Sequence, residues 1–202
     1  MQPRHFFAAL LLAAACGSTL AAPSLATGSA KGDWDLKQLM RDLGQVKVAK
    51  ARFVERRYLS MLKEPLLSSG TLTYIAPDKV EKTTLRPNAE SMLVDGDRIT
   101  IEGEKGRQRR TLMLSAHPEI AAFVESIRAT LAGDLPTLSR FYQVSLEGSP
   151  EEWHLRLEPV DKKMQEMVRS IRIDGSRQSV RGLEILEADG DRSEMTIVSD
   201  GS

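Results

Sequence analysis

The stretch ARFVERRYLSMLKEPLLSSGTLTYIAPDKVEKTTLRP, residues 51–87, decides how the rest of this chain must be organised. It predicts three long strands separated by turns, because β-branched and aromatic residues lie between proline, glycine and serine breaks. Val54, Tyr58 and Leu62 mark the first strand, and a break is expected at residues 68–70. Three such strands form a meander whose apolar face must be covered by other elements.

Further strands follow along the chain, separated by short turns. The Asp95-Gly96-Asp97 step between two short apolar runs is a strong hairpin signal. The other strands are expected at residues 107–114, 142–146, 153–157, 168–173, 180–186 and 195–198. Such evenly spaced strands predict one large antiparallel sheet, and the lack of strand–helix–strand alternation argues against a Rossmann or barrel enzyme.

Helical patterns lie on both sides of the first meander. Asp33 is a candidate N-cap for an amphipathic helix that ends at Leu43. A second helix is expected from Pro118 to Ala132, because proline is favoured at the first helical position and a glycine follows. A shorter helix is expected over residues 134–141. These helices are the candidates to cover the apolar face of the sheet.

The residues between 70 and 97 have a distinctive order of strands and prolines. They read Gly70-x-Leu72-x-Tyr74-x-x-Pro77, then a third strand that ends Arg86-Pro87, then Met92-Leu93-Val94-Asp95-Gly96-Asp97. This order resembles the periplasmic lipoprotein carrier proteins of the LolA type. The resemblance runs from about Trp34 to the C-terminus, and its specific part lies between Gly70 and Gly96.

The resemblance implies an α+β fold that is mainly β: an unclosed antiparallel β-barrel, or half-barrel, with helices lidding its concave hydrophobic face. It implies a periplasmic carrier that binds the acyl chains of a lipoprotein or lipid in this cavity and shuttles the cargo from the inner to the outer membrane. The expected partners are the acylated cargo, an inner-membrane donor complex and an outer-membrane acceptor, and the carrier is expected to be a monomer. The alternative is a β-rich periplasmic adaptor or structural module that binds protein and not lipid.

Nine apolar residues on the expected strands and helices are predicted to line the hydrophobic cavity. They are Phe53, Leu72, Tyr74, Val80, Leu93, Ile99, Phe123, Ile127 and Leu131. An aliphatic lining suits acyl chains, because burial of each methylene is favourable by about 0.8 kcal/mol. In the resembling family an arginine before the proline that follows the second strand helps to hold the lid closed. Ala76 stands there in this sequence, so we expect apolar contact to hold the lid without a specific hydrogen bond.

The N-terminal segment is expected to be an export signal and not part of the fold. Residues 1–22 combine a basic start, a short apolar run and small residues suited to cleavage. Residues 23–32 are expected to be a flexible leader, and residues 33–202 a single half-barrel domain. Cleavage after residue 22 removes Cys16, the one cysteine of the chain, and thereby excludes thiol chemistry. The alternative is a lipid anchor at Cys16.

Composition and motifs argue against several functional classes. The 28 basic residues balance 28 acidic ones, so the basic excess typical of a nucleic-acid binder is missing. The sequence has no phosphate loop, nucleophile elbow, dinucleotide fingerprint or metal-ligand spacing, and His117 and His154 are isolated. We therefore expect no enzymatic activity, no metal, no cofactor and no nucleic-acid partner.

Overall fold

The computed structural model describes residues 34–103 and 109–199 of this chain. Within them, eleven strands form one antiparallel sheet in the order β6-β5-β4-β3-β2-β1-β11-β10-β9-β8-β7. Strands β6 and β7 lie at opposite edges and do not pair, so the sheet is not closed into a barrel. The prediction of a mainly β fold with an unclosed antiparallel half-barrel is confirmed.

The elements follow one another as a meander, a helical section and a second meander. The strands are β1 Val48–Tyr58, β2 Leu66–Ile75, β3 Lys79–Arg86, β4 Glu90–Asp95, β5 Arg98–Gly103, β6 Arg109–Met113, β7 Tyr142–Ser149, β8 Glu152–Pro159, β9 Val168–Ser176, β10 Ser179–Glu187 and β11 Arg192–Ser199. The helices are α1 Leu36–Leu43, α2 Pro118–Ala132, α3 Leu135–Phe141 and α4 Lys162–Gln165, with a 3-10 turn at Leu114–Ala116. The predicted signal segment 1–22 and leader 23–32 lie outside the described residues.

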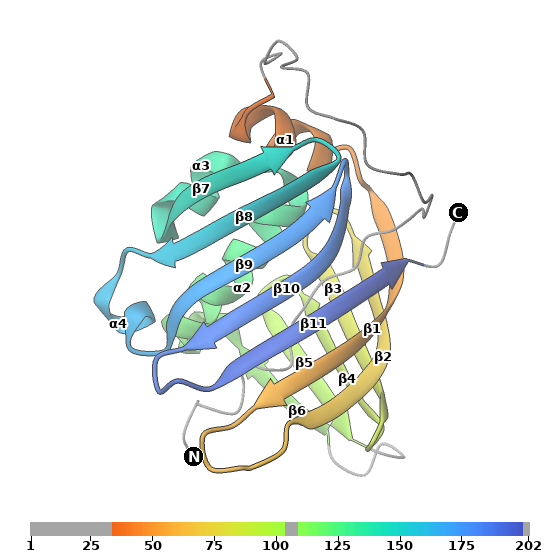
Figure 1. The fold of residues 1–202 in the computed structure, drawn as a ribbon. Helices are drawn as coiled ribbons and strands as arrows, with labels where there is room; N and C mark the ends of the chain where they lie inside the picture. The colour runs from red at the N-terminus through yellow and green to blue at the C-terminus, as the bar shows by residue number, and fades with distance from the viewer. Residues whose placement is uncertain (1–33, 104–108, 200–202) are drawn as a thin grey trace.

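Strand β1 joins the two halves of the sheet. It pairs with β2 on one side and with the last strand, β11, on the other, so Phe53 lies between Gly70 and Ile197. Figure 1 shows the sheet curving around α2 and α3, which lie on its concave side. Pairing of the first and last strands therefore produces one curved surface for the helices to cover.

Alternation along β1 gives the sheet an inner and an outer face. Ala51 and Phe53 are buried on the inner face, whereas Val54 is 46% exposed on the outer face. The strand ends at Tyr58, so the predicted extension to Leu62 is wrong: Leu62 lies exposed in the following loop. The loop occurs there because charged residues and a proline follow one another, and neither favours a strand interior.

The predicted break at residues 68–70 is also wrong, because β2 runs through it without interruption. Gly70 is required there by close packing and not by a turn. A Cβ atom at Gly70 would lie 1.9 Å from the Thr83 carbonyl oxygen and 2.9 Å from the Phe53 ring. Glycine in a strand often marks such a close approach, and sequence alone does not distinguish it from a turn.

The first helix begins two residues later than predicted. Asp35, and not Asp33, is its N-cap, and the Asp35 carboxylate accepts a hydrogen bond from the Gln38 N–H at 2.8 Å. Asp33 lies outside the described residues. Leu39 and Leu43 of α1 are buried, so this helix packs its apolar stripe into the core.

Helix α2 begins and ends where the sequence predicts. Pro118 occupies its first turn, and Gly133 ends it with φ 70°, a left-handed conformation that favours glycine. Helix α4 is an element that the sequence did not predict, because only a short turn is expected between the strands at residues 153–157 and 168–173. The Asp161 carboxylate caps it by accepting hydrogen bonds from the Lys163 and Met164 N–H groups, and the buried Met164 side chain anchors the helix to the core.

Candidate binding site between the helix layer and the sheet

The space between α2 and the C-terminal strands is the candidate binding site. Its walls are Ser126, Ile127 and Thr130 of α2 and Leu157, Ile171, Ile173, Val180 and Leu183 of β8, β9 and β10. The cavity has a volume of about 10 Å³, which is room for about one water molecule. The helix therefore fills the concave face in this state, and a larger ligand requires it to move.

The cavity walls offer a ligand mainly hydrocarbon. Ser126 Oγ donates a hydrogen bond to the Phe123 carbonyl oxygen at 2.6 Å, and Thr130 Oγ1 donates to the Ser126 carbonyl oxygen at 2.8 Å. Both hydroxyl groups therefore satisfy their donors within α2 itself. Burial raises the pKa of nearby Tyr142 to about 12, so its phenol stays neutral at physiological pH. This lining suits an apolar ligand better than a charged one.

Eight of the nine residues predicted to line a cavity are buried in the core that the sheet and helices share. They are Phe53, Leu72, Tyr74, Val80, Ile99, Phe123, Ile127 and Leu131. The strand register places Tyr74, Val80 and Ile99 in one row across the N-terminal half, with Val94 between the last two. Ile127 borders the present cavity. A ligand-binding role for the eight residues stays a prediction.

Leu93 is the ninth residue, and its placement differs from the prediction. It lies partly exposed on the outer face of β4, whereas its neighbours Met92 and Val94 are buried. A shift of one residue along a strand reverses the face of every side chain, and the apolar run Met92-Leu93-Val94 does not indicate its own register. The prediction also missed the cavity walls in β8, β9 and β10, although their strands were identified.

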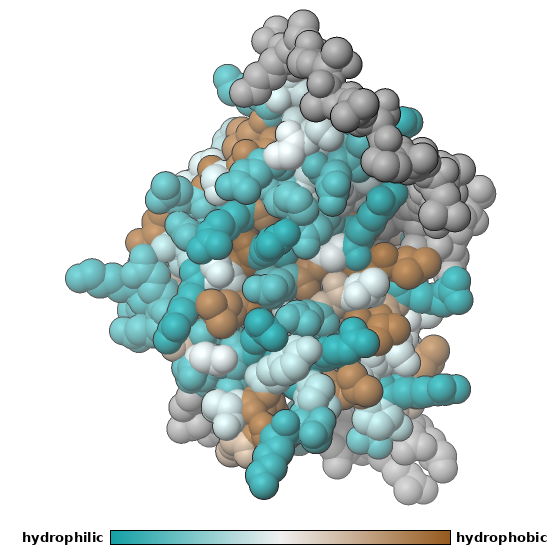
Figure 2. Space-filling view, in the orientation of Figure 1, coloured by the Kyte–Doolittle hydropathy of each residue, from teal (hydrophilic) through white to brown (hydrophobic). Residues whose placement is uncertain are grey.

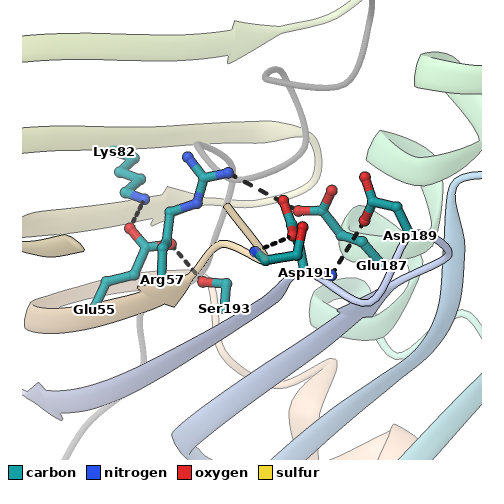
Figure 3. A network of polar contacts seen from close by, with 8 residues as sticks. Glu55, Arg57, Lys82, Glu187, Asp189, Asp191 and Ser193 are labelled. Atoms are coloured by element: carbon teal, nitrogen blue, oxygen red, sulfur yellow. Dashed lines mark hydrogen bonds and ion pairs between the residues drawn. The ribbon is translucent and has the colours of Figure 1, made fainter. Parts of the chain in front are cut away.

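A buried polar network interrupts the apolar inner face between β1, β3 and β11. Lys82 Nζ donates to Glu55 Oε2 at 2.8 Å, with the two side chains 3% and 2% exposed. Ser193 Oγ donates to Glu55 Oε1 at 2.7 Å, and Ser68 Oγ lies 3.1 Å from the same carboxylate. Figure 3 shows Glu55, Lys82 and Ser193 converging from these three strands. The carboxylate is thus fully hydrogen-bonded although it is buried.

The Lys82 ammonium is the buried cation of this network. Burial lowers its pKa below the usual value, and the Glu55 carboxylate acts in the opposite direction. Its Nζ atom also lies 4.8 Å from the centre of the Phe53 ring, a cation–π distance. Sequence reasoning missed the pair. The available signal was that Glu55 and Lys82 each stand two residues after a predicted inner-face residue.

Three carboxylates gather at the turn between β10 and β11, close to this network. Carboxylate oxygens of Glu187, Asp189 and Asp191 lie within 4.8 Å of one another. Arg57 lies 4.0 Å from Glu187, and Asp191 accepts a hydrogen bond from the Ser60 N–H at 2.8 Å. Figure 3 shows these contacts joining the turn to β1 and the loop that follows it. These contacts therefore hold the acidic turn against the end of β1 and the loop that follows it.

One side chain of α2 ties this helix to the hairpin between β4 and β5. Arg128 Nη2 donates to the Gly96 carbonyl oxygen at 2.7 Å, and Arg128 is 9% exposed. Its Nη1 atom lies 4.0 Å from Glu125, and within the described residues its buried Nε–H has no partner. A hydrogen bond to a charged group contributes roughly 1.5 to 3 kcal/mol. Movement of α2 away from the hairpin has to break this bond.

A comparison with protein-family models identifies the family to which this chain belongs. A family model described as outer membrane lipoprotein carrier protein LolA-like matches residues 27–200. The chain belongs to the LolA-like family. Members of this family are periplasmic carrier or binding proteins. No helix in the described part of this LolA-like protein is both long and apolar enough to cross a membrane. A search of curated proteins found no match.

Solved structures with a similar fold are distant in sequence from this LolA-like chain. A LolA superfamily protein from Nitrosomonas europaea is 9% identical, with 83% of this chain and 94% of that chain covered and a TM-score of 0.43. A putative outer membrane lipoprotein-sorting protein domain from Vibrio parahaemolyticus is 9% identical, with coverage of 80% and 88% and a TM-score of 0.39. A structure of MucB in complex with MucA is 14% identical, with coverage of 83% and 56% and a TM-score of 0.40.

The resemblance places the family's lid-holding arginine at position 76 of this LolA-like chain. Ala76 stands there, partly buried against the core. Lys79 and Arg57, the two cations that could take the role of that arginine, pair with carboxylates of the sheet: Lys79 Nζ lies 3.3 Å from Asp95 and Arg57 Nη2 lies 4.0 Å from Glu187. The expectation that no specific hydrogen bond holds the helix is wrong. Here the donor, Arg128, belongs to the helix and the acceptor, the Gly96 carbonyl oxygen, belongs to the hairpin between β4 and β5. In the resembling family the arginine donor lies after the second strand and the acceptors lie on a helix.

Proposed function

We propose that this LolA-like protein is an exported carrier that binds the acyl chain of a lipoprotein or lipid between α2 and the sheet. It would receive this cargo from an inner-membrane donor complex and deliver it to an outer-membrane acceptor. The observation that supports the proposal most directly is the apolar space between α2 and strands β8 to β10, whose hydroxyl groups are satisfied within the helix. Such walls favour hydrocarbon over polar ligands.

Binding requires α2 to move away from the sheet. The cavity of about 10 Å³ is far below the range of about 300 to 1,000 Å³ that is typical of ligand pockets. An acyl chain that enters covers the apolar surfaces that the movement would otherwise expose. Ten methylenes contribute roughly 8 kcal/mol of burial, which exceeds the roughly 1.5 to 3 kcal/mol of the Arg128 hydrogen bond. The ligand therefore favours the open state, because it interacts more strongly with that state.

The test is identification of whatever accompanies the protein through purification. The processed protein is isolated from the periplasm without detergent, extracted with organic solvent and examined by mass spectrometry. A carrier should release about one acylated molecule per chain, and the delipidated protein should then bind a fluorescent fatty acid. A folded protein that releases no lipid and binds no fatty acid would rule the carrier function out.

A protein-binding adaptor is the second candidate function. The filled interior favours it, because Phe123 and Leu131 are buried in the core and the cavity beside α2, among the residues that the structure describes, holds only about 10 Å³. In an adaptor these residues serve stability alone. Hydrogen exchange separates the two candidates: added fatty acid should loosen α2 in a carrier and leave its protection unchanged in an adaptor.

A further inference from the structure

Exposed aliphatic side chains gather at one corner of the sheet. Six of the eleven large hydrophobic residues exposed in the described chain lie on the loop after β1, at the start of β2, or on the outer faces of β1 and β3. They are Val54, Met61, Leu62, Leu66, Leu67 and Leu85. Figure 2 shows hydrophobic side chains standing among hydrophilic ones on the right of the view, where Figure 1 places β1 and β11. The clustering sets this corner apart from the rest of the surface.

A hollow of about 750 Å³ lies beside these residues on the outer face of β11, β1, β2 and β3. Among the described residues, its walls include Arg52, Arg56 and Arg86 and no acidic side chain. Arg56 and Arg86 form no ion pair with any described residue, and Glu194, which faces Arg56 across the strands, is held by Arg192 at 3.0 Å. The hollow therefore carries an excess of positive charge.

Arginine and aliphatic residues interleave on this outer face. Arg56 lies opposite Leu67, and Val54 lies opposite Ser69, which in turn faces Arg86 across β2 and β3. Guanidinium groups bind phosphate oxygens by charge-assisted hydrogen bonds, while aliphatic side chains enter the boundary between headgroups and acyl chains. The combination matches the chemistry of a phospholipid surface.

We infer that this corner docks the protein on the surface of an anionic phospholipid bilayer. The loop between β1 and β2 extends beyond the end of the sheet (Figure 1), and Met61 in it is 84% exposed. A protruding apolar loop penetrates a bilayer, whereas a protein partner would need a matching cavity to receive it. Met61 and Leu62 therefore insert, and the arginines of the outer face bind lipid phosphates.

The local charges orient this contact. Lys63 and Glu64 in the loop cancel one another, and the acidic turn at the base of the loop is tied down by the bond from the Ser60 N–H to Asp191. The arginine-lined outer face is thus the cationic side that approaches the bilayer. The inference does not depend on the cargo, because the candidate acyl site lies on the concave side of the sheet.

Sedimentation with lipid vesicles tests the inference. The processed protein from the periplasm is mixed with phosphatidylcholine vesicles that contain about a quarter phosphatidylglycerol, and separately with pure phosphatidylcholine vesicles. We expect binding to the anionic vesicles to exceed binding to the neutral ones severalfold. The double variant Arg56→Glu/Arg86→Glu should reduce binding to the anionic vesicles by about tenfold or more, and Met61→Ser/Leu62→Ser should weaken binding to both.

Matched control variants place the same changes elsewhere on the surface. Arg181→Glu on β10 and Val160→Ser after β8 alter exposed residues outside the corner and should bind like the wild type. Circular dichroism establishes that each variant is folded. The inference is overturned if the folded wild type binds no vesicles, if it binds both compositions equally, or if the controls lose as much binding. It is also overturned if light scattering shows a dimer that Arg56→Glu/Arg86→Glu dissociates, because the corner would then be a dimer interface.

Discussion

Neutralising the buried Glu55 should destabilise the protein strongly. Glu55→Gln keeps the shape of the side chain and one acceptor oxygen, where the carboxylate offers one oxygen to Lys82 and the other to Ser193. It leaves the Lys82 ammonium buried without a counter-charge. Removal of one partner from a buried ion pair typically costs about 3 to 5 kcal/mol. We expect about 3 kcal/mol, the lower end, because the amide oxygen still accepts a hydrogen bond.

The pH dependence of this loss follows from the pKa of Lys82. Burial already lowers that pKa, and without the opposing Glu55 carboxylate it falls further. The unfolded chain, with a lysine pKa of about 10.4, then binds more protons than the folded variant between the two pKa values. The free energy of unfolding of Glu55→Gln should therefore rise as the pH increases through that interval. As the pH rises toward about 10.4, the ordinary lysine pKa, the variant should recover part of its deficit against the wild type.

Urea unfolding measures both effects, with the slope of free energy against urea checked for constancy. Glu194→Gln is the matched control: it removes the carboxylate of an exposed pair with Arg192, which contributes only about 0 to 1 kcal/mol. The double variant Glu55→Gln/Lys82→Met should restore most of the lost stability, because it leaves no buried charge. A deficit no larger than that of Glu194→Gln would refute the reasoning, as would a double variant less stable than the single one.

Three further results are expected. Phe123→Asp should abolish fatty-acid binding and cost several kcal/mol of stability, because it places a charge in the core. Leu93→Asp, on the outer face of β4, should change neither binding nor stability by much. Equal losses in the two variants would show that the inner face is not the binding site. Arg128→Met removes the hydrogen bond to Gly96 while keeping an apolar side chain. Hydrogen exchange over residues 118–132 should therefore become faster, and fatty-acid affinity should rise severalfold. Unchanged protection would mean that the bond does not restrain α2. Mass analysis of the exported protein should find an N-terminus at or after Pro23 with no lipid, and an acylated Cys16 would instead indicate a membrane-anchored protein.

The sequence by itself determined the elements whose signals are local. Pro118 and Gly133 mark the ends of α2 through backbone restrictions that act within one helical turn. The Asp95-Gly96-Asp97 step specified the hairpin, and Gly96 indeed has φ 54°. The alternation of apolar and polar residues predicted the later strands of the sheet. Each of these signals depends on neighbouring residues, so the local sequence suffices to locate it.

Tertiary structure alone decided which faces meet and what lies between them. The pairing of β1 with β11 brings Ser193 to Glu55 across 138 residues of sequence, and no local pattern indicates that partner. The outward position of Leu93 depends on a register that one residue of shift would reverse. The two-residue spacing from Phe53 and Val80 assigns Glu55 and Lys82 to the inner faces of their strands, but only the fold brings the two side chains together. The pairing register of strands that are far apart in the sequence, and not local propensity, therefore determines the buried ion pair and the walls of the candidate cavity.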